Sequence, residues 1–166
     1  MADYYSPTVI QQMIPITGMT SLERLCLTNI FESEEHDEKL YFFASESPVS
    51  VIWLDHDELV SALAAPENAA YATMEEFREP LGRWRPSDSS VMVDLSVLSW
   101  ENFFQNILKR TTTLKYISAT TSYYCSKMRV DGFGGMVVLI TADAIMGKST
   151  DEVLAEMLDD AGIPIE

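Results

Sequence analysis

A nucleotide-binding pattern is the first feature of this sequence that could do chemistry. The segment Ala142-x-x-x-x-Gly147-Lys148-Ser149 is a permissive form of the phosphate-binding loop, and an apolar run precedes it. In such a loop, glycines let backbone N–H groups converge on phosphate oxygens, and the lysine contacts the terminal phosphates. Here an aspartate and two bulky apolar side chains intervene, and only 17 residues remain after Ser149 to supply a magnesium-binding aspartate. A turn leading into a helix capped by Ser149 is the better interpretation.

Two short runs combine carboxylates with a histidine, and both types of group bind metal ions. They are residues 34–38 (EEHDE) and 55–58 (DHDE). Neighbouring side chains on a helix point about 100° apart, so the second run does not converge on one ion. Acids at a helix start instead satisfy free N–H groups and the helix dipole. We therefore expect Asp55 to cap a helix, the region 32–38 to form a charged turn, and the chain to use no metal or other cofactor.

The two cysteines, Cys26 and Cys125, are the candidate nucleophiles. A nucleophilic thiol needs a base, and nothing in the spacing of His36 or His56 brings either histidine to a cysteine. The chain also lacks the Gly-x-Ser-x-Gly elbow of serine hydrolases. Cys26 falls on the apolar side of an expected helix, and Cys125 falls in an expected strand. Both are interpreted as small apolar side chains, and no catalytic residue is predicted.

Basic and aromatic residues alternate around a glycine-rich tip at 131–135. Aromatic rings can stack on nucleic-acid bases while basic side chains hold phosphates. Strand alternation, however, places Tyr116 and Tyr124 on the face opposite the other members of the group. This division favours an ordinary strand surface, and the group is kept only as a second candidate interaction surface. Its residues are Lys115, Tyr123, Lys127 and Arg129.

The charge of the chain is strongly acidic and unevenly distributed. It holds 26 acidic and 11 basic side chains, for a net charge of −15. Residues 1–80 carry 15 acids and 3 bases, residues 81–142 carry 4 acids and 7 bases, and residues 143–166 carry 7 acids and 1 base. This balance argues against direct binding of duplex DNA, whose phosphates attract lysine and arginine. Either the basic middle neutralises the acidic segments internally, or the acids form a binding surface.

The average acidity is too dilute to imitate DNA. A chain of this mass exposes roughly 8,300 Å², so the net charge averages about one per 550 Å², roughly a fifth of the density of B-DNA. An acidic binding surface therefore requires acids to converge locally, and a partner covers about 800 Å² on each side. The candidate residues for this patch are Glu32, Glu34, Glu35, Asp37, Glu38, Asp55, Asp57, Glu58, Glu75, Glu76 and Glu79.

The leading functional hypothesis is a non-enzymatic interaction protein whose acidic patch binds a basic protein partner. Small acidic α+β proteins of this kind include inhibitors and immunity proteins of nucleic-acid-handling enzymes, a comparison that rests on charge and size alone. One alternative is a small enzyme or ligand-binding domain with a carboxylate-lined pocket near Asp55 and Asp57. Another is an accessory subunit whose first 19 residues reach a neighbouring chain.

Local signals predict the elements that must position these residues. Capping residues followed by apolar side chains at helical spacing mark most of the helices. The last helix is expected to point Val153, Leu154, Met157 and Leu158 inward. Expected helices begin at Thr20, Asp55, Asn68, Ser99 and Ser149. Expected strands cover 40–44, 49–54, 91–95, 114–127 and 136–141, with the first two forming a hairpin.

Together these elements predict an α+β fold with a mainly antiparallel sheet and helices packed on it. The length of 166 residues fits one domain. We expect an extended arm over 1–19 and a single domain over 20–166. No uninterrupted run of 18 apolar residues is present, and the first residues lack a basic and apolar leader. The expected location is therefore cytoplasmic, without a membrane contact.

Overall fold

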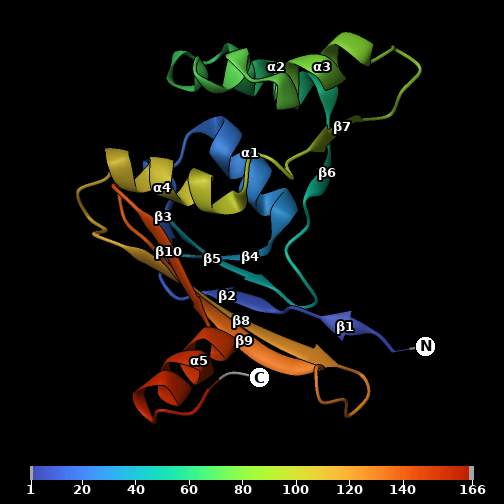
Figure 1. The fold of residues 1–166 in the computed structure, drawn as a ribbon. Coiled ribbons are helices and arrows are strands. Elements are labelled where there is room, and N and C mark those ends of the chain that lie inside the picture. The colour runs from blue at the N-terminus through green and yellow to red at the C-terminus, as the bar shows by residue number, and fades with distance from the viewer. Residues whose placement is uncertain (1, 165–166) are drawn as a thin grey trace.

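An eight-stranded sheet, antiparallel in every pairing, forms the centre of the computed structural model, which describes residues 2–164 (Figure 1). The strand order is β10-β9-β8-β2-β5-β3, with β1 beside β8 and β4 beside β5. The expected α+β class with a mainly antiparallel sheet is confirmed. The strands are β1 (Tyr4–Tyr5), β2 (Thr8–Ile10), β3 (Ile14–Pro15), β4 (Glu32–His36), β5 (Lys39–Ala44), β8 (Ile117–Cys125), β9 (Phe133–Ile140) and β10 (Ile145–Ser149).

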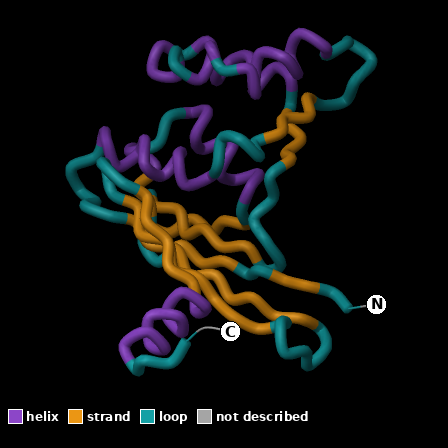
Figure 2. The backbone as a smooth tube through the Cα atoms, viewed as in Figure 1, coloured by secondary structure: helices purple, strands orange, loops and turns teal. Residues whose placement is uncertain are grey.

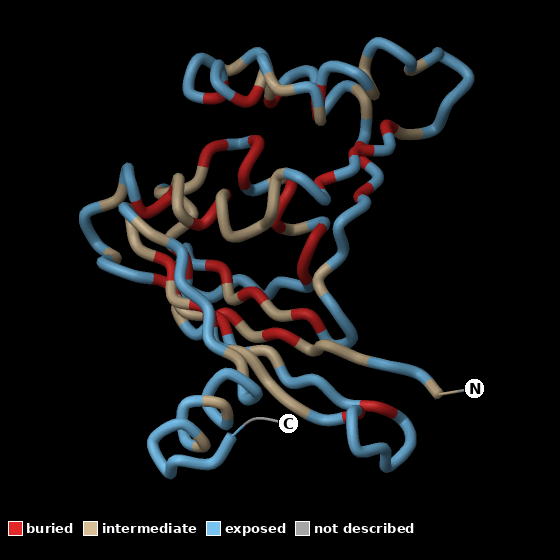
Figure 3. The backbone as a smooth tube through the Cα atoms, in the orientation of Figure 1, coloured by how far each residue is buried: buried red, intermediate tan, exposed pale blue. Residues whose placement is uncertain are grey.

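Two helices, α1 (Ser21–Ile30) and α4 (Trp100–Arg110), cover one face of this sheet (Figure 1). Alternation along the strands directs Phe42 and Ile117 into that layer, where Phe104 of α4 is also fully buried. The tube coloured by burial shows the buried residues concentrated between the helices and the sheet (Figure 3). Both helices lie where their apolar periodicity predicts them.

A second small sheet leads to two further helices, which lie above α1 (Figures 1 and 2). Its strands are β6 (Val51–Leu54) and β7 (Val91–Asp94), and the chain between them forms α2 (His56–Ala64) and α3 (Glu75–Arg83). The helix expected over residues 68–79 is instead broken into η2 (Pro66–Asn68), η3 (Tyr71–Thr73) and α3, and α3 continues through Pro80. Proline removes one helical hydrogen bond, but it does not end this helix.

The expected hairpin between residues 40–44 and 49–54 is wrong. β5 pairs with β4 through the two-residue turn Asp37–Glu38, while β6 pairs with β7. The run that was expected to be a charged turn is therefore the edge strand β4. All five of its residues are exposed, so it has no apolar alternation to reveal it.

The segment 1–19 was expected as an extended arm, but within its described residues 2–19 the chain forms β1, β2 and β3 of the main sheet. β2 lies between β8 and β5. Ile10 and Ile14 are completely buried, and the short helix η1 (Ile16–Gly18) then leads to α1. The segment contributes to the core, so these strands are not free to reach a neighbouring chain.

The phosphate-loop-like segment forms a β-hairpin. Thr141 and Ala144 close the turn, and residues 145–149 form β10 along β9. The backbone of Gly147 and Lys148 therefore belongs to strand pairing, and the Lys148 ammonium pairs with Glu156. Ser149 caps the following helix α5 (Thr150–Asp160), as expected, through a capping box with Glu152.

The apolar stripe of α5 is not covered, which corrects the expectation that it points inward. No residue of α5 is buried, and Leu154 and Met157 expose 55% and 62% of their surface. α5 lies on the side of the sheet opposite α1 and α4 (Figure 1). Periodicity identifies an apolar stripe, but it does not show that another element packs on that stripe.

Within residues 2–164, no helix combines the length and apolar character needed to cross a lipid bilayer.

Candidate functional site

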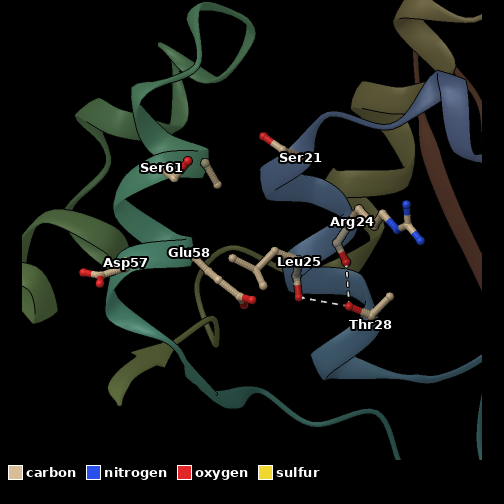
Figure 4. Close-up of a pocket in the computed structure, with 8 residues that line it drawn as sticks. Ser21, Arg24, Leu25, Thr28, Asp57, Glu58 and Ser61 are labelled. Atoms are coloured by element: carbon tan, nitrogen blue, oxygen red, sulfur yellow. Dashed lines mark hydrogen bonds between the residues drawn. The ribbon is translucent and has the colours of Figure 1, made fainter. Parts of the chain in front are cut away.

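The acidic residues of α2 border a cleft between α1 and α2 with a volume of about 530 Å³. Figure 4 shows Glu58 extending from α2 toward Leu25 of α1, while the Asp57 carboxylate points away from α1. The cleft is lined by Ser21, Arg24, Leu25, Thr28, Asp57, Glu58, Ser61 and Ala62.

Capping bonds position both walls of this cleft. The Thr20 side chain accepts a hydrogen bond from the Glu23 N–H, and the Glu23 side chain accepts one from the Thr20 N–H. On the other wall, Asp55 Oδ1 accepts hydrogen bonds from the N–H groups of Asp57 and Glu58, at 2.9 and 3.0 Å. Asp55 is therefore committed to capping, as predicted, and leaves Asp57 and Glu58 to face solvent.

Arg24 of α1 pairs with one acid of β4. Its guanidinium lies 3.5 Å from Glu35 Oε2, and the same side chain lines the cleft with Asp57 and Glu58. Glu35 pairs in register with buried Leu40, so it lies on the helix-covered side of the sheet. Among the described residues, only Glu35 of the predicted patch pairs with Arg24, and Figure 4 shows the Arg24 side chain directed away from α2.

The other acids of β4 lie on the opposite side of the sheet. Glu32 and Glu34 pair in register with Phe43 and Tyr41, whose side chains alternate away from the buried ones. Glu34 lies beside His36 on that side, at 3.4 Å. Strand formation therefore divides the predicted acidic run between two surfaces.

The acids of α3 face a different region. Glu79 pairs with Arg83 and lines a separate cavity that also contains Trp53 and Trp84. Glu75 is exposed and Glu76 is half-buried in the first turn of α3. The eleven predicted acids therefore do not form a single contiguous face, although ten of them are exposed.

Internal neutralisation accounts for little of this acidity. Among residues 81–142, only Arg83 and Arg110 of the seven basic side chains pair with a carboxylate of the described residues. The other five basic side chains of this segment form no ion pair within residues 2–164. The basic middle segment therefore forms few ion pairs with the acidic segments, and most of the exposed carboxylates have no basic partner within the described residues.

The second candidate surface is split along β8. Lys115 precedes this strand and Lys127 follows it, and nine strand residues at about 3.3 Å each separate the two by roughly 30 Å. Tyr123 donates to Met136 Sδ, and Arg129 donates to the Tyr4 hydroxyl at 3.4 Å. Only the residues at the far end of β8 can therefore act together.

Two of the hydroxyl groups that line the α1–α2 cleft are engaged in hydrogen bonds within the protein. Thr28 donates its hydroxyl to the backbone carbonyls of Arg24 and Leu25. The Ser21 hydroxyl accepts a hydrogen bond from the Asn68 amide at 3.1 Å, and an amide cannot act as a general base. No group of three or more histidine, cysteine or acidic side chains in residues 2–164 is arranged to hold a metal ion.

A buried ionic network, which sequence reasoning missed, lies behind this cleft. Glu23 is fully buried and pairs with Arg110 of α4, while the Tyr71 hydroxyl donates to Glu23 Oε1 at 2.9 Å. Asn106 donates in turn to the Tyr71 oxygen at 2.7 Å. Burial and the Glu23 charge raise the pKa of Tyr71 above its ordinary value. The capping-box pattern locates Glu23, but not its partners.

The same burial makes Cys26 unreactive. Desolvation, with a smaller contribution from the Glu23 charge, raises the pKa of the Cys26 thiol to about 12. The thiolate is the nucleophilic form of cysteine, and this pKa keeps the thiol protonated at neutral pH. Cys26 is therefore a core side chain, as its helical position predicts.

Comparison with known protein families, with curated proteins and with solved structures finds no match to this chain.

Proposed function

We propose that this protein is a non-enzymatic, cytoplasmic interaction protein that binds a basic protein partner through the acids of β4 and α2. A nucleic-acid-handling enzyme that the protein inhibits is the partner class best suited to this surface, because such enzymes carry basic surfaces that contact phosphates. The observation that carries the proposal is the exposed and largely uncompensated acidity described above. Uncompensated surface charge steers an oppositely charged partner and accelerates its association.

The turn between β4 and β5 supports this proposal. Asp37 and Glu38 have φ angles of 47° and 61°, in the left-handed region. The left-handed region favours glycine and also accepts aspartate and asparagine, so Asp37 suits its position, whereas a glutamate such as Glu38 costs roughly 1–2 kcal/mol there. Both residues are exposed. The chain thus keeps the Glu38 carboxylate at the turn between β4 and β5 despite its conformational cost.

Glu38→Gly is expected to raise the free energy of unfolding by about 1 kcal/mol because glycine removes the strain of a positive φ. Urea denaturation measures this change as a higher midpoint. Glu34→Gly is the matched control, since it removes the same charge from an extended position of β4. That control should destabilise the protein, and equal effects of the two substitutions would contradict the account of the turn.

The proposed function predicts that charge location, and not only net charge, determines partner binding. One variant replaces Glu34, Glu35, Asp37, Glu38 and Glu58 with their amides. The matched control replaces Asp3, Asp143, Asp151, Asp159 and Asp160 with asparagine. Both variants change the net charge from −15 to −10, and neither touches the buried network.

Affinity capture at low salt, followed by mass spectrometry, compares these two variants with the native protein. We expect the first variant to capture about tenfold less of a basic partner protein than the native protein does, and the control to capture the same amount. The reason is that local electrostatic steering changes association rates by about 10- to 1,000-fold. Raising the salt concentration should release the partner from the native protein. Equal capture by the two variants, or capture that does not respond to salt, would overturn the proposal.

The cleft itself supports a second candidate function, a ligand-binding domain that uses Glu58 and the hydroxyls beside it. The observation in its favour is the entry of the Glu58 side chain between α1 and α2 (Figure 4). A thermal-shift screen of small cationic ligands separates the two functions. A ligand that stabilises the native protein but not Glu58→Gln supports the cleft as a binding site.

A further inference from the structure

A second cavity, of about 710 Å³, lies beside α3 and β7 and shares no lining residue with the α1–α2 cleft. Its volume falls within the range of typical small-molecule sites. It lies between the end of α3, the connection to β7 and the outer face of the small sheet. It is lined by Trp53, Glu79, Pro80, Arg83, Trp84, Ser87, Asp88, Ser89, Ser90, Val91, Met92 and Asp94.

The small sheet contributes an exposed aromatic wall to this cavity. Trp53 of β6 pairs in register with Met92 of β7, and the two expose 62% and 50% of their surface. Asp94 lies two residues after Met92, so strand alternation places its carboxylate on the same outer face. An indole, a thioether and a carboxylate are therefore adjacent on a surface that packs against no element of the main core.

The position of Trp84 is fixed on its other side by His56. The two rings stack with their centroids 3.7 Å apart and an interplanar angle of 16°. His56 is itself bonded to Asp57 at 2.8 Å. Trp84 also lines the cavity, so this stacking restrains one of the two tryptophans of its lining.

The charge around the cavity is negative. Its lining includes the carboxylates of Glu79, Asp88 and Asp94 and one guanidinium, Arg83, which pairs with Glu79. Asp88 uses one oxygen to accept the Arg85 N–H at 2.8 Å. Asp94 uses one oxygen for the Ser96 N–H and hydroxyl, and these bonds lower the Asp94 pKa. Each aspartate keeps its second oxygen for a ligand, and the lining carries a net charge of −2.

We propose that this cavity binds an organic cation through an alkylammonium or guanidinium group. Tryptophan has the ring face that attracts such cations best, with the cation within about 6 Å of the ring centroid. The two aspartates supply the compensating charge, and Met92 contacts the alkyl portion. The group can belong to a free small cation or to a lysine or arginine side chain of a protein. The inference does not rest on the acidic-patch proposal, because it uses different residues and a different surface.

Choline and its neutral isostere, 3,3-dimethylbutan-1-ol, are the probes that test this site. The two have nearly the same shape and differ in charge. Titration is followed at constant ionic strength by the three indole N–H signals in a nitrogen-15 NMR spectrum. Choline should shift the signals of Trp53 and Trp84 and leave that of Trp100, which lies outside the cavity, in place. The isostere should bind more weakly by about tenfold or more.

Two variants locate the interaction. Trp53→Leu is expected to weaken choline binding by about 5- to 30-fold, which corresponds to the loss of one partly desolvated cation–π contact. Asp88→Asn combined with Asp94→Asn should weaken it by a comparable factor. The matched control, Asp151→Asn combined with Asp159→Asn, changes the net charge equally without touching the cavity. Because Trp53 and both aspartates are exposed, these variants are expected to remain folded.

A third set of titrations distinguishes the sources of the cation. Spermidine represents free polyamines, and short capped peptides with a central lysine, trimethyllysine or arginine represent protein side chains. Binding of either class at Trp53 supports the cavity as a cation site, and their relative affinity identifies the source. Equal binding of choline and its isostere, equal effects of the cavity and control variants, or no response to any of these cations would overturn the inference.

Discussion

Glu23→Ala is expected to lower the free energy of unfolding by about 2–4 kcal/mol, because it leaves the buried Tyr71 hydroxyl without its acceptor and removes a capping bond, while the partly exposed Arg110 can be hydrated. Arg110 of α4 pairs with Glu23, and the Tyr71 hydroxyl and the Thr20 N–H donate to the same carboxylate. The alanine variant thus loses contacts to three separate segments at once. It also removes half of the capping box that starts α1.

Urea denaturation measures this loss of stability. Two further variants show how much of it comes from the charge of Glu23 and how much from the Tyr71 hydroxyl. Glu23→Gln retains the shape of the side chain and most of its hydrogen-bonding capacity, so its cost should be smaller than that of alanine. Tyr71→Phe deletes only the hydroxyl and should cost about 1–3 kcal/mol because Asn106 loses its acceptor. The exposed Glu67→Ala serves as a surface control, with a change within about 0.5 kcal/mol. A cost for Glu23→Ala as small as that of the control would show that the network does not stabilise the folded chain.

Local chemistry allowed the starts of α1, α2 and α5 to be predicted, whereas the helix expected from Asn68 was wrong. Thr20 and Glu23 are three residues apart, so their capping box depends only on the chain between them. The same holds for Ser149 with Glu152, and for Asp55 with the two N–H groups that follow it. Strand pairing has no such local rule. Residues 40–44 could form a hairpin either with the segment before them or with the segment after them. The preceding segment, β4, is the one that pairs, and it contains no apolar residue that would indicate a strand.

The acidic site was predictable as a set of residues and not as a surface. Adjacent acids in a turn can share one face, whereas successive residues of a strand point to opposite faces. Once residues 32–36 form β4, Glu34 and Glu35 must separate, and only Glu35 reaches Arg24. The cavity beside α3 is even harder to predict from the sequence. Trp53 and Trp84 are 31 positions apart, and the β6–β7 pairing that places Met92 beside Trp53 is long-range.

The aromatic cluster beneath α1 and α4 carries the other large effect that we expect. Phe104 has its ring centroid 6.1 Å from that of Phe31, 5.8 Å from Phe42 and 5.9 Å from Trp100. It is completely buried, and Phe104→Ala should cost about 3–5 kcal/mol from lost burial and the cavity that remains. For a chain of this length that corresponds to a fall in melting temperature of about 6–20 °C.

Met157→Ala in α5 is the informative comparison, because the sequence pattern places Met157 and Phe104 equally in the core. Met157 exposes 62% of its surface, so its replacement should change the free energy of unfolding by no more than about 0.5 kcal/mol. Leu154→Ala, at 55% exposure, should behave in the same way. Urea denaturation at several protein concentrations measures all three variants. A core-sized, concentration-dependent cost at Met157 would mean that another copy covers the α5 stripe in solution. A core-sized cost that does not depend on concentration would mean that α5 packs more closely on its own sheet than its exposure indicates.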